Sequence, residues 1–285
     1  MSQLLKGAPA AAALNERTAA LCAALAQKGV TPTLAVVRVG GKPDDLAYER
    51  GLLARCAKVG VAVRCLPLSE GVSQAQLLDE IQQINQDPGI HGCLLLRPLP
   101  AGLDEETVRN ALDPAKDVDG ITDASLAGLL SGSGQGFAPC TAQACLELLH
   151  HYQIPLEGRR AVVVGRSLVV GRPAALLLDR ANATVTVCHS RTRDLPALCR
   201  QADVLVAALG RPQALGADCF RPGQVVVDVG IHVGADGRLC GDICAEAAQQ
   251  AEVRFTPVPG GVGAVTTAVL ALHAAQAAQR ASNSD

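Results

Sequence analysis

Short runs of β-branched and other apolar residues alternate with longer segments of helical periodicity along most of the chain. A first series of three runs covers residues 34–39, 61–66 and 93–96. A second series of four covers residues 161–164, 184–188, 204–208 and 225–229. Apolar runs of this length are typical of buried parallel strands. Strands that alternate with helices join through right-handed crossovers, so the pattern predicts an α/β fold with parallel sheets.

A segment rich in glycine and serine, residues 128–136, separates the two series. Pro139-Cys140-Thr141 follows it and leads into a helix that Thr141 is expected to cap. We therefore place a domain boundary here and assign residues 139–263 to a second, Rossmann-like domain. The last helix is expected to return to the first domain, which then comprises residues 1–138 and 264–285.

The composition favours a small-molecule partner. A chain of 285 residues with 49% apolar content can bury two modest cores. With 25 basic against 27 acidic residues, no strong field exists to attract nucleic acid or an anionic membrane. No apolar stretch approaches the length of a membrane span, and the first residues lack the order of a signal peptide, so a cytoplasmic protein is expected.

The cysteines give no sign of a metal site. Eleven of them are scattered through apolar runs, without zinc-type spacing to one another or to histidine. Cys240 and Cys244 have no second pair nearby. We expect buried, reduced thiols and no metal.

A candidate dinucleotide site follows the first strand of the second series. That strand ends in Gly165-Arg166-Ser167, and Gly171 opens the next helix, which is the order that a pyrophosphate site requires. Ser167 stands where the usual fingerprint has glycine. Taken alone, the motif therefore also fits an ordinary strand-to-helix turn.

The end of the next strand favours NADP over NAD as the cofactor. It reads Cys188-His189-Ser190-Arg191-Thr192. An acidic residue here would bind a free 2′-hydroxyl and repel a 2′-phosphate, whereas Ser190 and Arg191 donate to phosphate. Arg166 could reach the same group from the glycine loop. The backbone near Ile231, after a later strand, is placed to meet the nicotinamide.

Several separated strings, taken in order, resemble one known family, the FolD-type methylenetetrahydrofolate dehydrogenase/cyclohydrolases. The strings are Pro98-Leu99-Pro100, residues 116–120 (KDVDG), Pro139-Cys140-Thr141, the glycine loop with residues 170–173, residues 189–192, and residues 256–263 (TPVPGGVG), the most specific. The similarity spans about residues 31–272. It implies an N-terminal folate-binding domain, an NADP domain, a cleft between them and a homodimer acting on tetrahydrofolate derivatives.

Family members oxidise 5,10-methylenetetrahydrofolate to the methenyl cation and hydrolyse that cation to 10-formyltetrahydrofolate. The nitrogen lone pair of the substrate drives hydride loss, so oxidation mainly requires orientation of the carbon against nicotinamide. Hydrolysis also requires water activation and proton transfer. The resemblance attributes that work to a Tyr-x-x-x-Lys pair, a glutamine at a strand end and an aspartate that grips the pterin.

By this resemblance, Tyr48 and Asp119 are the catalytic and substrate-binding residues, and Pro259, Gly260 and Gly261 also contact substrate. Two other positions depart from the family pattern, because Leu52 replaces the lysine and Leu96 the glutamine. Leucine cannot move a proton. Arg55 lies a turn beyond the lysine position, and Arg97 would point to the opposite face of a regular strand from Leu96. Neither is an isosteric replacement, and an arginine is a poor general base.

The main hypothesis is an NADP-dependent methylenetetrahydrofolate dehydrogenase whose cyclohydrolase activity is weak or absent. A fully bifunctional enzyme is the alternative if Arg55, Tyr48 and water compensate. A non-catalytic regulator that binds folate or NADP would be favoured if Asp119 or the glycine loop were broken, and both are intact. The string TPVPGGVG argues against a shikimate-type dehydrogenase.

Overall fold

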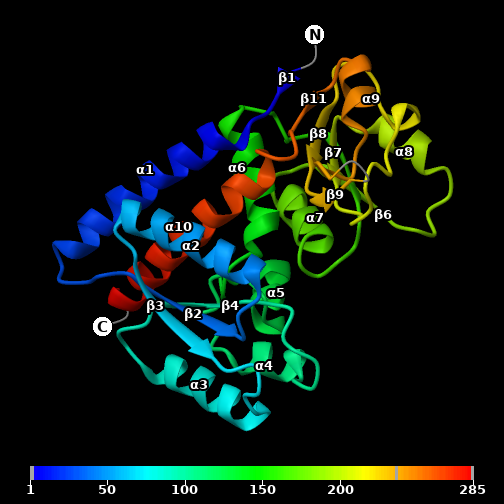
Figure 1. The fold of residues 1–285 in the computed structure, drawn as a ribbon. Coiled ribbons are helices and arrows are strands. Elements are labelled where there is room, and N and C mark those ends of the chain that lie inside the picture. The colour runs from blue at the N-terminus through cyan, green and yellow to red at the C-terminus, as the bar shows by residue number, and fades with distance from the viewer. Residues whose placement is uncertain (1–2, 235–236, 284–285) are drawn as a thin grey trace. The chain divides into compact units, whose positions relative to one another are not determined.

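The computed structural model of the chain describes residues 3–234 and 237–283 (Figure 1). These form two compact units. The Rossmann-like unit comprises the residues up to Ala12 together with Thr141–Thr266. The N-terminal unit comprises Ala13–Cys140 and the residues from Thr267 onward.

The N-terminal unit contains a three-stranded parallel sheet. The strand order is β3-β2-β4, with β2 at Thr33–Val39, β3 at Ala62–Leu68 and β4 at Gly92–Leu95. All of β4 and the centre of β2 are buried, whereas β3 is partly exposed as an edge strand. Its helices are α2 (Pro43–Val59), α3 (Gln74–Gln86), α4 (Glu105–Ala111), α5 (Asp123–Ser131), and most of α1 (Gly7–Ala26) and α10 (Val262–Ser282).

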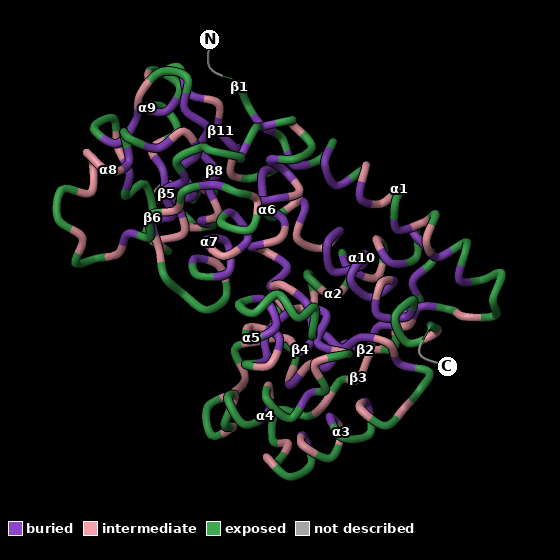
Figure 2. The backbone as a smooth tube through the Cα atoms, turned by 180° about the vertical axis from the view of Figure 1, so that it is seen from behind, coloured by how far each residue is buried: buried purple, intermediate pink, exposed green. Residues whose placement is uncertain are grey.

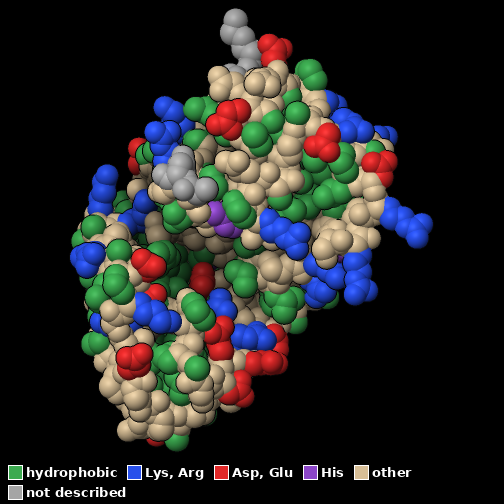
Figure 3. All heavy atoms as spheres, turned by 45° about the vertical axis from the view of Figure 1, so that its right-hand side comes forward, with side chains coloured by type: hydrophobic (Ala, Val, Ile, Leu, Met, Phe, Trp, Pro, Cys, Tyr) green, Lys and Arg blue, Asp and Glu red, His purple; other side chains and the backbone are tan. Residues whose placement is uncertain are grey.

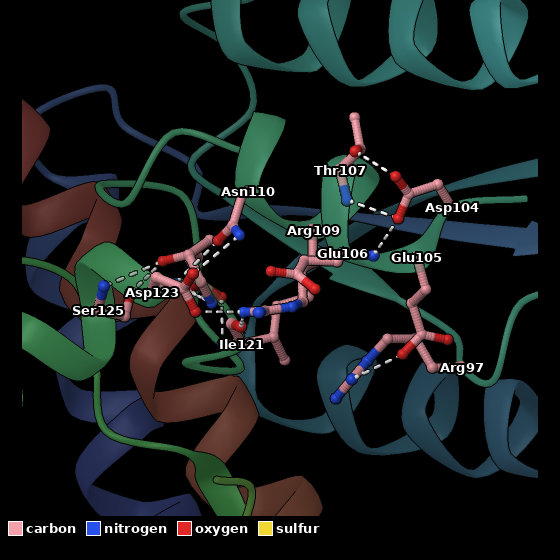
Figure 4. Close-up of polar contacts among 12 residues, drawn as sticks. Arg97, Asp104, Glu105, Glu106, Thr107, Arg109, Asn110, Ile121, Asp123 and Ser125 are labelled. Carbon is pink, nitrogen blue, oxygen red and sulfur yellow. Dashed lines mark hydrogen bonds and ion pairs between the residues drawn. The ribbon is translucent and has the colours of Figure 1, made fainter.

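Helix starts in this unit follow from capping chemistry. Ser73 and Gln76 form a reciprocal capping box at α3. The carboxylate of Asp104 accepts from two backbone N–H groups at the start of α4 (Figure 4), and Thr122 caps α5. Helix α2, which carries Tyr48, begins with a proline in its first turn and ends at left-handed Gly60.

The Rossmann-like unit contains a six-stranded parallel sheet in the order β1-β11-β8-β7-β5-β6. The strands are β1 (Gln3–Leu4), β5 (Arg160–Val164), β6 (Thr184–Cys188), β7 (Val204–Ala207), β8 (Val225–Asp228) and β11 (Arg254–Phe255). Its other elements are α6 (Cys140–His151), α7 (Gly171–Arg180), α8 (Leu195–Gln201), α9 (Ala245–Gln250), the 3₁₀ turn η1 (Ala217–Cys219), and the hairpin of β9 (His232–Val233) and β10 (Leu239–Cys240). Buried residues follow β5, β7 and β8 (Figure 2), as expected for central parallel strands.

All seven predicted strands are present, but the structure differs from the sequence prediction at two places. The two-residue strands β1 and β11 pair with each other, so the residues before Ala12 belong to the Rossmann-like unit and not to the first domain. Strands this short carry no periodicity that a sequence pattern could reveal. Helix α6 begins at Cys140, so Thr141 lies inside it and is not its cap.

The surface and the thiols add three observations. Acidic and basic side chains both occur on the face shown in Figure 3, in keeping with the near balance of charge. All eleven cysteines are free, and three of them, Cys65, Cys240 and Cys244, are only partly buried. Within residues 3–234 and 237–283, no helix has the length and apolarity to cross a membrane, and no cluster of three metal-ligating side chains occurs.

Candidate active site

The KDVDG turn is held rigidly in the N-terminal unit. Lys116 Nζ donates to two backbone carbonyls, Ile84 O and Asp87 O, each at 2.6 Å. The buried carboxylate of Asp117 accepts from Ile121 N at 3.0 Å, Thr122 N at 2.8 Å and Ser125 Oγ at 2.6 Å. Gly120 has φ +67°, and a Cβ there would lie 2.5 Å from Pro139 N. The side chains of Lys116 and Asp117 are thus engaged in holding the turn in place.

Asp119 is the second carboxylate of this turn and the one that the sequence predicted to bind substrate. It is half-buried. Burial, together with the charge of Asp117, raises the pKa of its carboxyl to about 6, while Arg97 and a hydrogen bond from Cys140 act in the opposite direction. The group is therefore mainly ionised at neutral pH and takes up a proton in mildly acidic solution.

Tyr48 on α2 belongs to the same electrostatic neighbourhood. Its side chain is 38% exposed. Partial burial raises the pKa of its phenol well above the usual range, and the charge of Asp119 adds to the shift, whereas Arg55 opposes it. The hydroxyl therefore stays neutral and able to donate. The structure thus brings the two sequence-predicted folate residues together.

Leu52 and Leu96, where the resemblance implies a lysine and a glutamine, carry apolar side chains. Leu52, one turn after Tyr48 on α2, is fully buried in the apolar core. Leu96, directly after β4, is half-buried and donates its backbone N–H to Val37 O at 2.9 Å. Arg55 donates to Asn15 Oδ1 at 3.1 Å. No proton-transfer group therefore occupies the lysine or the glutamine position.

Arg97 lies where regular strand alternation would not place it. Strand β4 ends at Leu95, so Leu96 and Arg97 do not follow that alternation. The guanidinium of Arg97 bonds Glu105 Oε1 at 3.1 Å (Figure 4), and Glu105 Oε2 accepts from Leu99 N at 3.0 Å. Its charge is close enough to lower the pKa of Asp119. Glu105 thus holds a cation close enough to Asp119 to affect its pKa.

The glycine loop of the Rossmann-like unit leaves no room for side chains. Gly165 has φ +131°, and a Cβ there would lie 2.0 Å from Ala208 O. A Cβ at Gly171 would lie 2.3 Å from Gly165 O. Ser167 Oγ accepts from Val170 N at 3.1 Å and from Gly171 N at 3.3 Å, so it closes the turn into α7. This role explains why serine replaces glycine here, and the exposed Arg166 precedes it.

The turn after β6 presents two donors to solvent. Thr192 Oγ1 accepts from His189 N at 2.8 Å, and His189 Nδ1 accepts from Arg191 N at 3.2 Å, so these residues shape the turn. The side chains of Ser190 and Arg191 are exposed at its tip. An anionic 2′-phosphate fits this donor set.

Two buried aspartates, which the sequence pattern did not reveal as site residues, shape the loops at the carboxyl ends of β7 and β8. Asp242 accepts from His232 Nε2 at 2.8 Å and from three backbone N–H groups, those of Leu209, Gly210 and Arg211. Asp228 accepts from the N–H groups of Gly230, Asp242 and Ile243, and burial raises its pKa to about 6. The only sequence signal for either residue was the position of Asp228 at the end of a strand.

The loop after β8, together with Leu239 and the TPVPGGVG turn, lines one cavity of about 340 Å³. It brings Ile231, which is 61% exposed, together with Pro259, Gly260 and Gly261. The start of α1 braces the turn, because Gly7 N donates to Gly260 O at 2.7 Å. A Cβ at Gly7 would lie 2.1 Å from Gly261 O.

Comparison with known families decides the assignment. Residues 5–119 match the model of the tetrahydrofolate dehydrogenase/cyclohydrolase catalytic domain, and residues 139–282 match that of its NAD(P)-binding domain. The chain belongs to this family. The family predicted from the separated motifs and the two-domain α/β fold class are thereby confirmed.

Members of the tetrahydrofolate dehydrogenase/cyclohydrolase family match the chain over nearly its whole length. The bifunctional protein FolD of Carboxydothermus hydrogenoformans is 46% identical over 281 residues, which is 98% of each chain. The crystal structure of FolD from Campylobacter jejuni has a TM-score of 0.94 and 36% identity, covering 98% of this chain and 99% of that one. The Trypanosoma brucei enzyme, complexed with NADP cofactor and inhibitor, has a TM-score of 0.89 and 30% identity, covering 98% of each chain.

Proposed function

We propose that the chain oxidises 5,10-methylenetetrahydrofolate to 5,10-methenyltetrahydrofolate with NADP, and that it has little or no cyclohydrolase activity. The observation that carries the second part is the complete burial of Leu52 at the position of the family's lysine. The first part is supported by family membership, the intact glycine loop and the retained Tyr48 and Asp119.

Each unit has a separate task in the oxidation. The ionised Asp119 accepts hydrogen bonds from the pterin's amino and ring N–H groups, and the neutral Tyr48 hydroxyl donates to the substrate. The backbone at Gly165 and Gly171 would hold the pyrophosphate of NADP, and Ser190 and Arg191 would hold its 2′-phosphate. When bound, NADP supplies the hydride acceptor. Because the substrate's own nitrogen drives hydride loss, orientation is the protein's main contribution.

Hydrolysis of the methenyl product makes a demand that these residues do not meet. Water must lose a proton as it attacks, and a general base with a pKa near neutrality serves that step best. Leu52 and Leu96 carry no such group, and an arginine such as Arg55 or Arg97 is a poor general base. The carboxyl of Asp119 has a pKa of about 6, but it is engaged by the pterin in this proposal.

Two assays on one preparation test the proposal. Methylenetetrahydrofolate with NADP should yield NADPH, whereas loss of the methenyl compound without cofactor should match the buffer rate. Acceleration in both assays would instead favour the bifunctional enzyme, with a water organised by Tyr48 and Arg55. NADP binding without turnover in either assay would favour a non-catalytic regulator.

We further propose that the chain works in the cytoplasm as a homodimer. The hairpin of the Rossmann-like unit supports an association surface, because Val233 is 72% and Leu239 is 44% exposed. Light scattering at micromolar concentration should give twice the chain mass. A single-chain mass there would exclude the dimer.

A further inference from the structure

A buried thiol and a buried imidazole lie directly behind the folate carboxylate. Cys140 begins α6, and His273, which is 6% exposed, lies on α10, the red helix of Figure 1. Cys140 Sγ donates to Val118 O at 3.2 Å, and His273 Nδ1 lies 2.9 Å from the same oxygen. The two side chains are 3.7 Å apart, measured from Sγ to Nδ1. The proposed function uses neither of them.

The chemistry of a carbonyl fixes the direction of these bonds. Val118 O can only accept, so His273 Nδ1 carries the hydrogen, and the single hydrogen of the Cys140 thiol lies within reach of both this oxygen and the Asp119 carboxylate. That carbonyl belongs to the peptide that enters Asp119. The Val118 side chain also packs closely on Gly92, where a Cβ would lie 2.6 Å from Val118 Cγ1.

His273 is itself clamped on its ring face. Its centroid lies 4.8 Å from that of Phe137, and the two planes are inclined by 34°. The guanidinium of Arg280 lies 4.1 Å from the Phe137 centroid and donates to Gly136 O at 2.8 Å. The imidazole therefore has little freedom to move. Its hydrogen bond to the Val118 carbonyl restrains the positions of residues 118 and 119.

We propose that His273 is a positioning residue for Asp119, acting through the Val118 carbonyl together with the Cys140 thiol. This inference rests on the proposed function, in which Asp119 binds the pterin. A hydrogen-bonding carboxylate must be aligned with two pterin donors at once, and displacement by about 1 Å in such a site lowers turnover up to about a hundredfold. The restraint acts on the folate and leaves the cofactor untouched.

A matched pair of variants isolates the bond. His273→Leu removes the donor and keeps an apolar side chain, whereas His273→Asn places an amide N–H where Nδ1 lies. We expect His273→Leu to raise the KM for methylenetetrahydrofolate about tenfold, the ordinary effect of losing one buried hydrogen bond, with the KM for NADP unchanged. His273→Asn should stay within about twofold of the wild type.

Two results would overturn the inference. One is a folded His273→Leu protein with an unchanged folate KM, and the other is an equal rise in the KM for NADP, which would indicate a general structural role. If His273→Leu does not fold, His273→Phe against His273→Asn makes the same comparison with a ring that fills the site and lacks the donor. If the wild type shows no turnover, the proposed function fails, and calorimetry with tetrahydrofolate on wild type and variants then decides whether His273 positions Asp119.

Discussion

The Rossmann-like unit builds its candidate site mostly from backbone, whereas the N-terminal unit builds its own from side chains. In the former, Gly165 and Gly171 leave no space for a Cβ, and the buried Asp228 and Asp242 hold loops through N–H groups. In the latter, Tyr48 and Asp119 present functional groups on a helix and a rigid turn. Backbone sites tolerate exchanges such as serine at position 167, but a side-chain site changes its chemistry with each exchange.

On the proposed function, this difference accounts for a folate half that lacks one reaction and keeps the fold. Leu52 is fully buried in the N-terminal unit, so a leucine at the position that the resemblance gives to lysine adds apolar burial. No comparable exchange is available at Gly165, because any Cβ meets backbone.

The largest effect is expected from Gly165→Ala. The new Cβ would lie 2.0 Å from Ala208 O in a backbone conformation that L residues rarely adopt. We expect NADP binding to fall by more than about a hundredfold, since the strain alone costs about 1–3 kcal/mol and the loop must move. Titration of NADP measures the loss. Gly223→Ala is the control, because Gly223 also has positive φ but a Cβ there would meet no atom within 4 Å. Equal losses of NADP affinity in both variants would refute the proposal that the backbone at Gly165 binds the pyrophosphate.

The sequence could predict those parts of the structure that rest on local patterns. The seven longer strands show as apolar runs, and Gly165 shows as a glycine after a strand. The pairing of β1 with β11, the bonds from Asp242 to residues 209–211 and the contact of His273 with Val118 join segments far apart in the chain. Such contacts depend on tertiary packing, which periodicity does not record.

The second largest effect is expected from Asp119→Asn. The amide of asparagine has one oxygen that accepts and one nitrogen that only donates, so it cannot present an acceptor atom to each of the two pterin donors. It also lacks the negative charge that strengthens each hydrogen bond. We expect kcat/KM for methylenetetrahydrofolate to fall about a hundredfold with NADP affinity unchanged. Steady-state kinetics with each substrate varied provides the measurement. Asp123→Asn is the control, because that exposed carboxylate pairs with Arg109 and should have little effect on turnover (Figure 4). Normal turnover by the Asp119 variant would remove this residue from the site.

A smaller effect is expected from Arg191→Ala in the cofactor half, where a side chain adds specificity to a backbone site. Losing one charge-assisted bond to the 2′-phosphate should raise the KM for NADP about tenfold and leave the KM for NAD unchanged. Arg193→Ala, an exposed arginine two residues later, is the matched control. Should wild type prefer NAD, the assignment of Ser190 and Arg191 would be wrong.

The smallest effect is expected from the pH dependence that Arg97 imposes on the folate half. The pKa of Asp119 is raised to about 6, and the groups that face it are Asp117, Tyr48, Cys140 and Arg97. Because the ionised form binds the pterin, kcat/KM should decline as pH falls through about 6 in the wild type. Arg97 lowers this pKa, so Arg97→Met should move the decline to higher pH, with a loss below about tenfold at pH 6 and none well above it.

The matched variant and the sign of the stability effect sharpen this test. Arg97→Lys keeps the charge and should keep the wild-type profile. A carboxyl with a raised folded-state pKa is stabilised by protonation, so between its unfolded value of 3.8 and about 6 acidification should stabilise the fold through Asp119 while activity declines. Activity and this contribution to stability therefore move in opposite directions in one pH window. If the decline stays at the same pH in Arg97→Met, Arg97 does not lower the pKa of Asp119. The pKa of Asp119 would then be set by burial, Asp117 and Cys140.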